Sequence, residues 1–156
     1  MSEVVPLEPS CIVIFGISGD LSKRYLLPAL FHLTKVGLLN SQTTIIGISR
    51  QSISTDELLN GVDLHHGEPE QPDDADALTR LHDQITMVQL DLENQTDYQA
   101  LRQRLDVMEN ERGVCLNRIF YLSIPPKAFN GVIEHIGEAG LNGTCSHGTT
   151  KSSCHE

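Results

Sequence analysis

Positively charged residues are scarce in this 156-residue chain, which has 11 lysines and arginines against 21 aspartates and glutamates and a formal net charge of −10. Proteins that follow nucleic-acid phosphates need a basic surface, so nucleic acid is a poor partner. Apolar runs are too short for a membrane span, and the first residues lack the basic and apolar segments of a secretory leader. We therefore expect a cytoplasmic protein with no nucleic-acid or membrane partner.

Cysteines are also few, and their positions are Cys11, Cys115, Cys145 and Cys154. This spacing is too irregular for the disulfide framework of a small secreted protein. The first two adjoin apolar runs and are expected to be core thiols. The last two could form a zinc cluster with His147 and His155, because thiolate and imidazole are the usual ligands of structural zinc. The spacing matches no standard ligand pair, so we predict no metal site and a polar C-terminal end.

The strongest pattern in the sequence is a short apolar run that leads into two glycines and then into a helical repeat. Residues 12–15 have the β-branched content of a buried strand, Gly16 and Gly19 follow, and leucines recur at helical spacing over residues 20–36. Glycines let the backbone turn tightly and approach a phosphate, and a helix N-terminus offers unpaired N–H groups. The pattern predicts a dinucleotide-binding turn.

The rest of the chain alternates between strand and helix patterns. Further strands are expected at residues 43–48, 84–92 and 118–124, and helices at 96–107 and 128–139, the former with Tyr98, Leu101 and Leu105 inward. Another helix is expected to start at Ser54, before an acidic loop over residues 61–76. This order favours an α/β fold with a doubly wound parallel sheet, a Rossmann-like dinucleotide-binding domain.

Histidines give no catalytic base in this pattern. The adjacent His65 and His66 are interpreted as solvated side chains, because neighbours in sequence cannot share one helix face. His32 and His135 fall on expected helices and His82 lies just before a strand, so surface or packing roles are favoured for all three.

Ligands of doubly wound sheets bind beyond the carboxyl ends of the strands, where the strand order reverses. Residues 16–20, 49–51, Asp91 and residues 125–129 all follow expected strands, so they would line one crevice. For Asp91 and the prolines among them, an ordinary turn role is the competing interpretation.

The residue after the second strand indicates which dinucleotide would bind. Enzymes that use NAD usually place a carboxylate there, whereas Arg pairs with the 2′-phosphate of NADP. This chain has Arg50, and Ser49 or Gln51 could add a neutral hydrogen bond. The glycine pattern is G-x-x-G-x-x-S, with Ser18 in place of the usual second glycine, where its hydroxyl could reach the cofactor phosphates. We therefore expect a preference for NADP.

Four segments together resemble the N-terminal domain of the glucose-6-phosphate dehydrogenases. They are Gly16-Ile-Ser-Gly-Asp-Leu-Ser-Lys-Arg24, Leu27-Pro-Ala-Leu30, Ile46-Gly-Ile-Ser-Arg50 and Asn117-Arg-Ile-Phe-Tyr-Leu-Ser-Ile-Pro-Pro126. The resemblance implies oxidation of glucose 6-phosphate to 6-phosphogluconolactone with NADP, in the pentose phosphate pathway. It assigns cofactor binding to Gly16, Ile17, Ser18, Gly19, Asp20, Leu21, Ser22, Lys23, Arg50 and Phe129, while Gln51 and Asp91 are expected contacts from their places in the crevice.

The chain departs from this family in two places. Tyr25 stands where the family commonly has a lysine near the substrate phosphate, which would weaken substrate binding. After Lys151 the family continues into a further strand, into the segment that binds the substrate phosphate, and into a β+α substrate domain. We expect a cofactor-binding domain over residues 1–151 without its last strand, an atypical tail over 152–156, and no catalytic residue.

Three functional interpretations follow. The first is the NADP-binding part of a longer dehydrogenase, truncated, frameshifted or excerpted, whose full-length form could be a homo-oligomer. The second is a stand-alone NADP-binding or sensing module without catalysis. The third is a small Rossmann reductase that uses a Tyr and Lys pair, for which the sequence offers no Tyr-x-x-x-Lys spacing.

Overall fold

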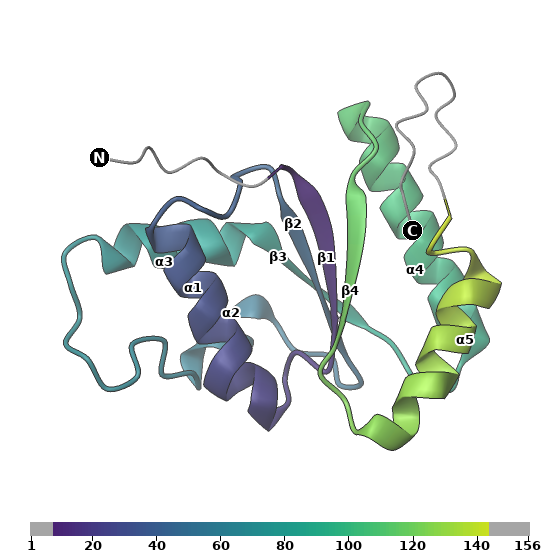
Figure 1. Ribbon diagram of the computed structural model, residues 1–156, viewed down its shortest axis with the longest axis horizontal. Helices are drawn as coiled ribbons and strands as arrows, with labels where there is room; N and C mark the ends of the chain where they lie inside the picture. Colours follow the sequence, from purple (N-terminus) through teal and green to yellow (C-terminus); the bar gives the residue numbers. More distant parts are fainter. Residues whose placement is uncertain (1–7, 144–156) are drawn as a thin grey trace.

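The computed structural model describes residues 8–143, which form one four-stranded sheet covered by helices (Figure 1). The strands are β1 (Ser10–Phe15), β2 (Thr44–Ser49), β3 (Ile85–Gln89) and β4 (Asn117–Leu122). All pairs are parallel and the order is β3-β2-β1-β4. In the register, Val13 of β1 lies beside Ile46 of β2 and Phe120 of β4. The four strands therefore end at one edge of the sheet.

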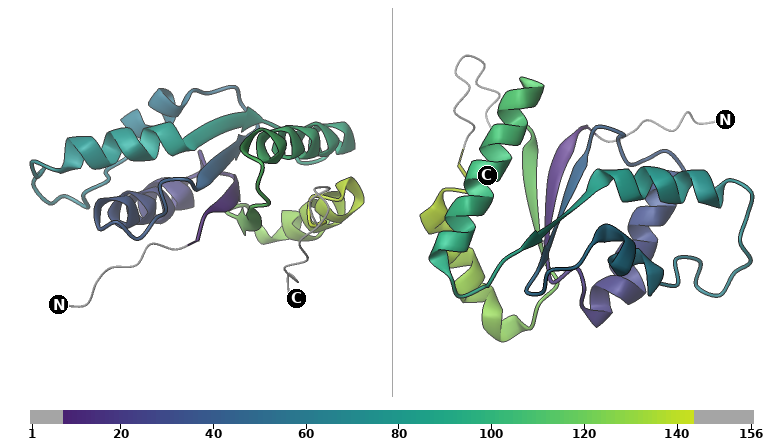
Figure 2. Two further views of the ribbon diagram at one scale, coloured as in Figure 1. Left: turned by 90° about the horizontal axis from the view of Figure 1, so that it is seen from above. Right: turned by 180° about the vertical axis from the view of Figure 1, so that it is seen from behind.

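Helices cover both faces of this sheet, as expected for a doubly wound fold. One face carries α1 (Leu27–Lys35), α2 (Thr55–Asn60) and α3 (Asp74–Gln84), and the other carries α4 (Gln95–Arg112) and α5 (Phe129–Ala139). Figure 2 shows the sheet between the α1–α3 pair and the α4–α5 pair. Two separate buried clusters result, one on each face. On the second face Tyr98, Leu101 and Leu105 of α4 point inward, as the sequence predicted.

The direction of the connections reverses at β1, between β2 on one side and β4 on the other. The chain runs from β1 through α1 to β2 and then through α2 and α3 to β3, always toward one side. It then crosses through α4 to β4 on the other side of β1. Such a reversal separates the loops that leave the carboxyl ends of the two strands and creates a crevice there.

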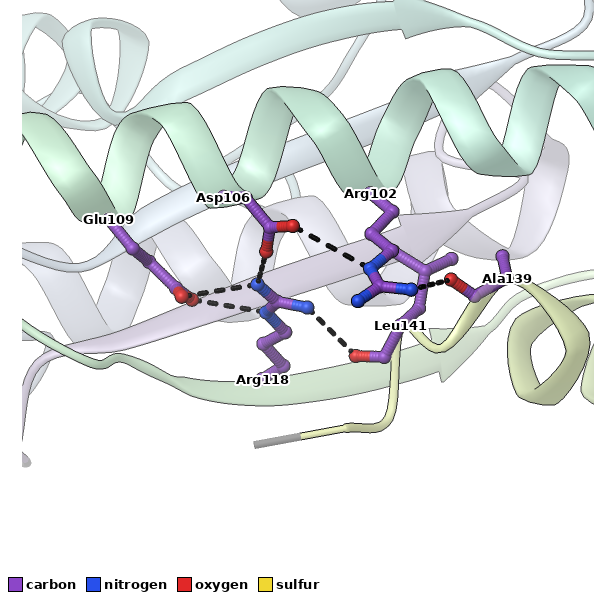
Figure 3. A network of polar contacts seen from close by, with 6 residues as sticks. All are labelled: Arg102, Asp106, Glu109, Arg118, Ala139 and Leu141. Carbon is purple, nitrogen blue, oxygen red and sulfur yellow. Dashed lines mark hydrogen bonds and ion pairs between the residues drawn. The ribbon is translucent and has the colours of Figure 1, made fainter. Parts of the chain in front are cut away.

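The amino end of β4 is fixed by a buried ionic network (Figure 3). Arg118 donates from Nε and Nη2 to the Glu109 carboxylate at 3.0 and 3.1 Å, and from Nη2 to Asp106 at 2.8 Å. Its Nη1 donates to the Leu141 carbonyl at 3.0 Å, while Arg102 Nη1 donates to the Ala139 carbonyl at 3.0 Å. Burial lowers the pKa of Arg118, but the two carboxylates raise it by more, so the guanidinium stays charged. The network ties β4, α4 and the end of α5 together.

The first helix covers residues 20–35, close to the predicted 20–36, but it is not a regular α-helix throughout. A π-helical turn, η1 (Ser22–Leu26), precedes α1. We infer that Pro28 causes this π-helical turn. Proline has no N–H to donate to the carbonyl four residues earlier, so regular α-helical hydrogen bonding is interrupted there. Leu21, which belongs to the predicted helical repeat of leucines, is exposed.

Helix α3 is the largest element that sequence analysis missed. It begins at Asp74, inside the segment predicted as a loop, and the third strand is correspondingly shorter than residues 84–92. Only Asp74, Ala77 and Leu81 are buried along this helix, so its apolar stripe is too narrow to stand out in the sequence. The predicted helix start at Ser54 is confirmed, with a complete capping box to Glu57.

Two side-chain predictions are wrong. Cys115 is exposed, because the segment between α4 and β4 turns Leu116 inward instead, whereas Cys11 is buried as expected and burial raises its pKa to about 12. His65 packs edge-on against Phe31, with ring centroids 5.3 Å apart, and is only partly solvated. His66 is exposed as predicted.

The zinc cluster that the sequence analysis considered, at residues 145–155, lies outside the described residues. Between residues 8 and 143, no group of three or more potential metal-ligating side chains is found. None of the helices in this range is long and apolar enough to span a membrane.

Candidate dinucleotide-binding site

The glycine turn after β1 is fixed by close backbone contacts. Gly16 has a φ of +80°, and a Cβ at this position would lie 2.1 Å from the carbonyl oxygen of Ser123. Its N–H donates to the Ile48 carbonyl at 3.1 Å, and the N–H of Gly19 donates to the Gly16 carbonyl at 3.0 Å. Only glycine fits at position 16, because any side chain would meet β4 and the left-handed backbone would be strained. The turn therefore lies wedged between the ends of β2 and β4.

Serine hydroxyls join this turn to the neighbouring strands. The buried Ser22 hydroxyl donates to the Gly16 carbonyl at 3.0 Å and is 2.8 Å from the Ser123 hydroxyl, just after β4. Ser18 Oγ lies 3.3 Å from Ser49 Oγ at the end of β2. The third small position of the glycine pattern, Ser22, thus fixes the start of the helix, whereas Ser18 and Ser49 line the crevice.

A cavity of about 750 Å³ opens at the carboxyl edge of the sheet. The loops after all four strands and the first turns of α5 line it, so the four segments that sequence analysis placed around one crevice do meet. Its lining residues are Gly16, Ser18, Gly19, Ile48, Ser49, Arg50, Leu90, Asp91, Leu92, Glu93, Ser123, Ile124, Pro125, Lys127, Ala128, Gly131, Val132 and His135.

Charges of both signs lie around the cavity. Arg50 is exposed, and its guanidinium has no ion-pair partner among residues 8–143. Lys127 adds a second cation after β4, whereas Asp91 and Glu93 lie after β3. One Asp91 oxygen already accepts the Glu93 N–H at 3.0 Å, within its own turn. Arg50, at the end of β2, and Lys127, after β4, are therefore the two cations of the cavity lining, and neither forms an ion pair with another described residue.

Five of the predicted cofactor residues line the cavity, namely Gly16, Ser18, Gly19, Arg50 and Asp91. The others lie around it. Ile17 and Ser22 are buried beneath the turn. Asp20 and Leu21 are exposed at the start of the helix, where Asp20 pairs with Arg24 at 3.1 Å, and Lys23 is half-buried. Gln51 is exposed and donates its N–H to Ser49 Oγ at 3.2 Å, while Phe129 is half-buried at the start of α5 and does not line the cavity.

His135 of α5 is among the lining residues that sequence analysis did not place at the crevice. It shares a helix face with Ala128, Gly131 and Val132, all of which face the cavity. The three- and four-residue spacing of these positions was the available signal, because such residues lie above one another on a helix.

Comparisons with known proteins agree with this geometry. A family model described as "Glucose-6-phosphate dehydrogenase, NAD binding domain" matches residues 13–151. The glucose-6-phosphate 1-dehydrogenase of Chlamydia pneumoniae is 34% identical over 142 residues, which cover 85% of this chain and 26% of the relative. That of Rhizobium meliloti is 33% identical over 146 residues, which cover 90% of this chain and 28% of the relative.

Solved structures show the same likeness. A glucose-6-phosphate dehydrogenase in complex with its substrate glucose-6-phosphate superposes with a TM-score of 0.77 at 31% identity, over 89% of this chain and 29% of that one. The glucose-6-phosphate 1-dehydrogenase of Mycobacterium avium gives 0.72 at 25% identity, over 85% and 27%. The chain spans about a quarter of the length of the relatives that it matches. It belongs to the NAD(P)-binding domain family of the glucose-6-phosphate dehydrogenases.

Proposed function

We propose that this chain is the NADP-binding part of an oxidoreductase that converts glucose 6-phosphate and NADP into 6-phosphogluconolactone and NADPH. The family membership supports the reaction class. The observation that carries the choice of NADP is Arg50, an exposed guanidinium at the end of β2 that lines the cavity and has no ionic partner within residues 8–143. A planar guanidinium suits bidentate contact with a phosphate.

The residues of the cavity fit a dinucleotide. Gly16 and Gly19 let the turn pack tightly against the Ser123 carbonyl at the wall of the cavity, and the helix that starts at Asp20 would offer unpaired N–H groups to a pyrophosphate there. Arg50 would hold the 2′-phosphate of the adenosine ribose, with Ser18 and Ser49 as neutral hydrogen-bonding neighbours. When bound, NADP supplies the hydride acceptor of the reaction.

The chemical step also needs a base that removes the hydroxyl proton of the sugar. No residue between positions 8 and 143 is assigned to that role. His32 is exposed on α1, whereas His82 is half-buried on α3, where its Nε2 pairs with Asp56 at 2.9 Å. We propose cofactor binding without turnover for this chain, and glucose 6-phosphate binding and homo-oligomer formation for the longer enzyme of which it would be part.

Calorimetric titration of the 156-residue chain with NADP and with NAD tests the proposal. We expect NADP to bind at least about tenfold more tightly than NAD, and Arg50→Ala to abolish that difference by weakening NADP alone. Arg104→Ala, which removes an exposed arginine of α4 outside the cavity, is the matched control and should change neither affinity.

A folded chain that binds neither cofactor would refute the proposed function. Equal affinities for NADP and NAD in the wild-type chain would refute the role of Arg50 and leave a dinucleotide site of broader specificity. Reduction of NADP by this chain on addition of glucose 6-phosphate would refute the absence of turnover.

A further inference from the structure

Three aromatic rings form a stack that runs from the centre of the sheet to the cavity. Phe15, the last residue of β1, stacks on Tyr98 of α4 with ring centroids 6.1 Å apart and planes at 22°. Tyr98 in turn stacks on His135 of α5, at 4.8 Å and 23°. Phe15 and Tyr98 are fully buried, and His135 lines the cavity. The stack therefore ends in a ring at the surface of the candidate site.

Hydrogen bonds hold the middle ring, Tyr98, and the ring at the cavity, His135, in place. The Tyr98 hydroxyl donates to the Leu92 carbonyl at 2.8 Å, and its pKa is raised to about 12 by burial and then by Asp91 and Asp97, so the ring stays neutral. His135 Nδ1 hydrogen-bonds to the side-chain oxygen of Gln95, the first residue of α4. Stacking on one face and a hydrogen bond at one edge fix the orientation of the imidazole.

Aliphatic residues share the cavity lining with His135. Its side chain is 24% exposed, and because Tyr98 covers one ring face, the other face is the one that remains for the cavity. Leu90 and Leu92 lie after β3, Ala128 immediately precedes α5, and Val132 lies one turn before the histidine on the same face of α5. Aliphatic walls beside an oriented ring suit a flat heterocycle better than a phosphate or a sugar.

We propose that His135 is the stacking surface for the purine base of the bound dinucleotide. This inference rests on the proposed function, because it assigns a residue within the same cavity. The glycine turn would fix the pyrophosphate and Arg50 the 2′-phosphate, which places the adenosine ribose at the end of β2. The purine is the aromatic group attached to that ribose, and the apolar part of the cavity next to His135 is where it fits.

Paired titrations with NADP and NAD separate this role from that of Arg50. Both dinucleotides contain the purine, so His135→Ala should weaken both by the same factor, about fivefold or more, and leave their ratio unchanged. His135→Phe keeps a stacking ring and should retain both affinities within about twofold. Glu134→Ala, which alters the neighbouring exposed residue outside the cavity, is the control and should have no effect.

A measurement on the wild-type chain decides the question even if His135→Ala does not fold. Addition of 2′,5′-ADP, which carries the purine and the 2′-phosphate without nicotinamide, should shift the His135 Hε1 resonance through the ring current of the base. The resonance is assigned by its loss in His135→Phe.

Unchanged affinities in folded His135→Ala, an equal loss in His135→Phe, or an unmoved Hε1 resonance on saturation would each overturn the inference while leaving NADP binding by the wild-type chain intact. A folded wild-type chain that binds neither dinucleotide nor 2′,5′-ADP would overturn this inference together with the proposed function.

Discussion

The two edges of the parallel sheet use polar groups in opposite ways. At the amino edge the Arg118 guanidinium is surrounded by Glu109, Asp106 and the Leu141 carbonyl, so its hydrogen-bonding groups have partners inside the protein. At the carboxyl edge Arg50 is exposed beside a cavity, without an ion pair in the described part of the chain. Both are arginines at the ends of strands, and they differ in whether their partners come from within the fold.

This difference separates groups that hold the fold together from groups that remain available to a ligand. A buried charge must be paired, because its desolvation otherwise costs several kcal/mol. An exposed guanidinium has no such requirement and can receive a phosphate. The carboxyl edge also depends on bare backbone at Gly16, whereas the amino edge depends on long charged side chains.

Gly16→Ala should have the largest effect and would break the carboxyl edge. The new Cβ would lie 2.1 Å from the Ser123 carbonyl oxygen at a φ of +80°, so the turn and the start of β4 would have to move apart. We expect a loss of more than about 4 kcal/mol in the free energy of unfolding, measured by urea titration, together with loss of NADP binding.

Gly61→Ala is the matched control, because no atom lies within 4 Å of its added Cβ and its φ is −97°. It should change stability by less than about 0.5 kcal/mol. Similar stabilities for Gly16→Ala and Gly61→Ala would contradict the close contact between the turn and β4.

Arg118→Met should have the next largest effect and would break the amino edge. It leaves the Glu109 carboxylate, 1% exposed, without its cationic partner. We expect the free energy of unfolding, measured by urea titration, to fall by about 3 kcal/mol. The loss should be smaller when Glu109→Leu is combined with Arg118→Met, because the second substitution removes the unpaired buried carboxylate. Arg80→Ala, which breaks the exposed pair with Asp76, should cost at most about 0.5 kcal/mol.

If the Arg118→Met and Arg80→Ala chains were equally stable, the amino-edge network would contribute no more than a surface pair. NADP affinity is a second measurement on the same variant. We expect folded Arg118→Met to bind NADP as tightly as the wild-type chain, because Arg118 does not line the cavity.

Asp74→Asn should have the smallest effect. It extends the comparison to a third polar cluster, which lies between α1 and α3. The Gln71 N–H and then Lys35, whose Nζ lies 2.7 Å from Asp74 Oδ1, lower the pKa of this carboxyl below its ordinary value of 3.8. A lowered pKa means that the folded state binds its proton less readily than the unfolded state. The stabilisation is therefore present above about pH 3.8 and is lost as the pH falls further.

Thermal melts of Asp74→Asn and wild type should accordingly differ at pH 7 and converge below pH 3.8. Asp76→Asn, at an exposed position of the same helix, should match wild type throughout. A difference for Asp74→Asn that stays constant down to pH 2 would show that its charge contributes nothing to stability.

Local signals explain what could be predicted from the sequence. The glycine turn, the apolar strands and the inward Tyr98, Leu101 and Leu105 of α4 are encoded by residue type and spacing within short windows. The meeting of four strand ends at one cavity followed from the handedness of parallel crossovers, which leaves little freedom in the fold. The roles of the predicted cofactor residues, and the division at residue 151, stay predictions.

The features that were missed depend on contacts between distant parts of the chain. Helix α3 is mostly polar and is stabilised by packing of Ala77 and Leu81 against the α1 side of the sheet. His135 is hydrogen-bonded to Gln95, which lies 40 positions earlier in the sequence, and Arg118 is hydrogen-bonded to the Leu141 carbonyl, 23 positions later. Such pairings cannot be seen in a hydrophobic pattern, because the pattern records which face is buried and not which polar groups meet there.

The length of α4 has a consequence for how the domain moves. Its 18 residues span about 27 Å, from Gln95 beside the candidate site to the Glu109 end beside Arg118. A stiff helix anchored at both ends cannot tilt at one without displacing the other, so small rotations of α4 would link the two edges of the sheet. Amide exchange along this helix would then proceed as one cooperative unit, and a ligand that slows opening at its first turn would also slow it at the last.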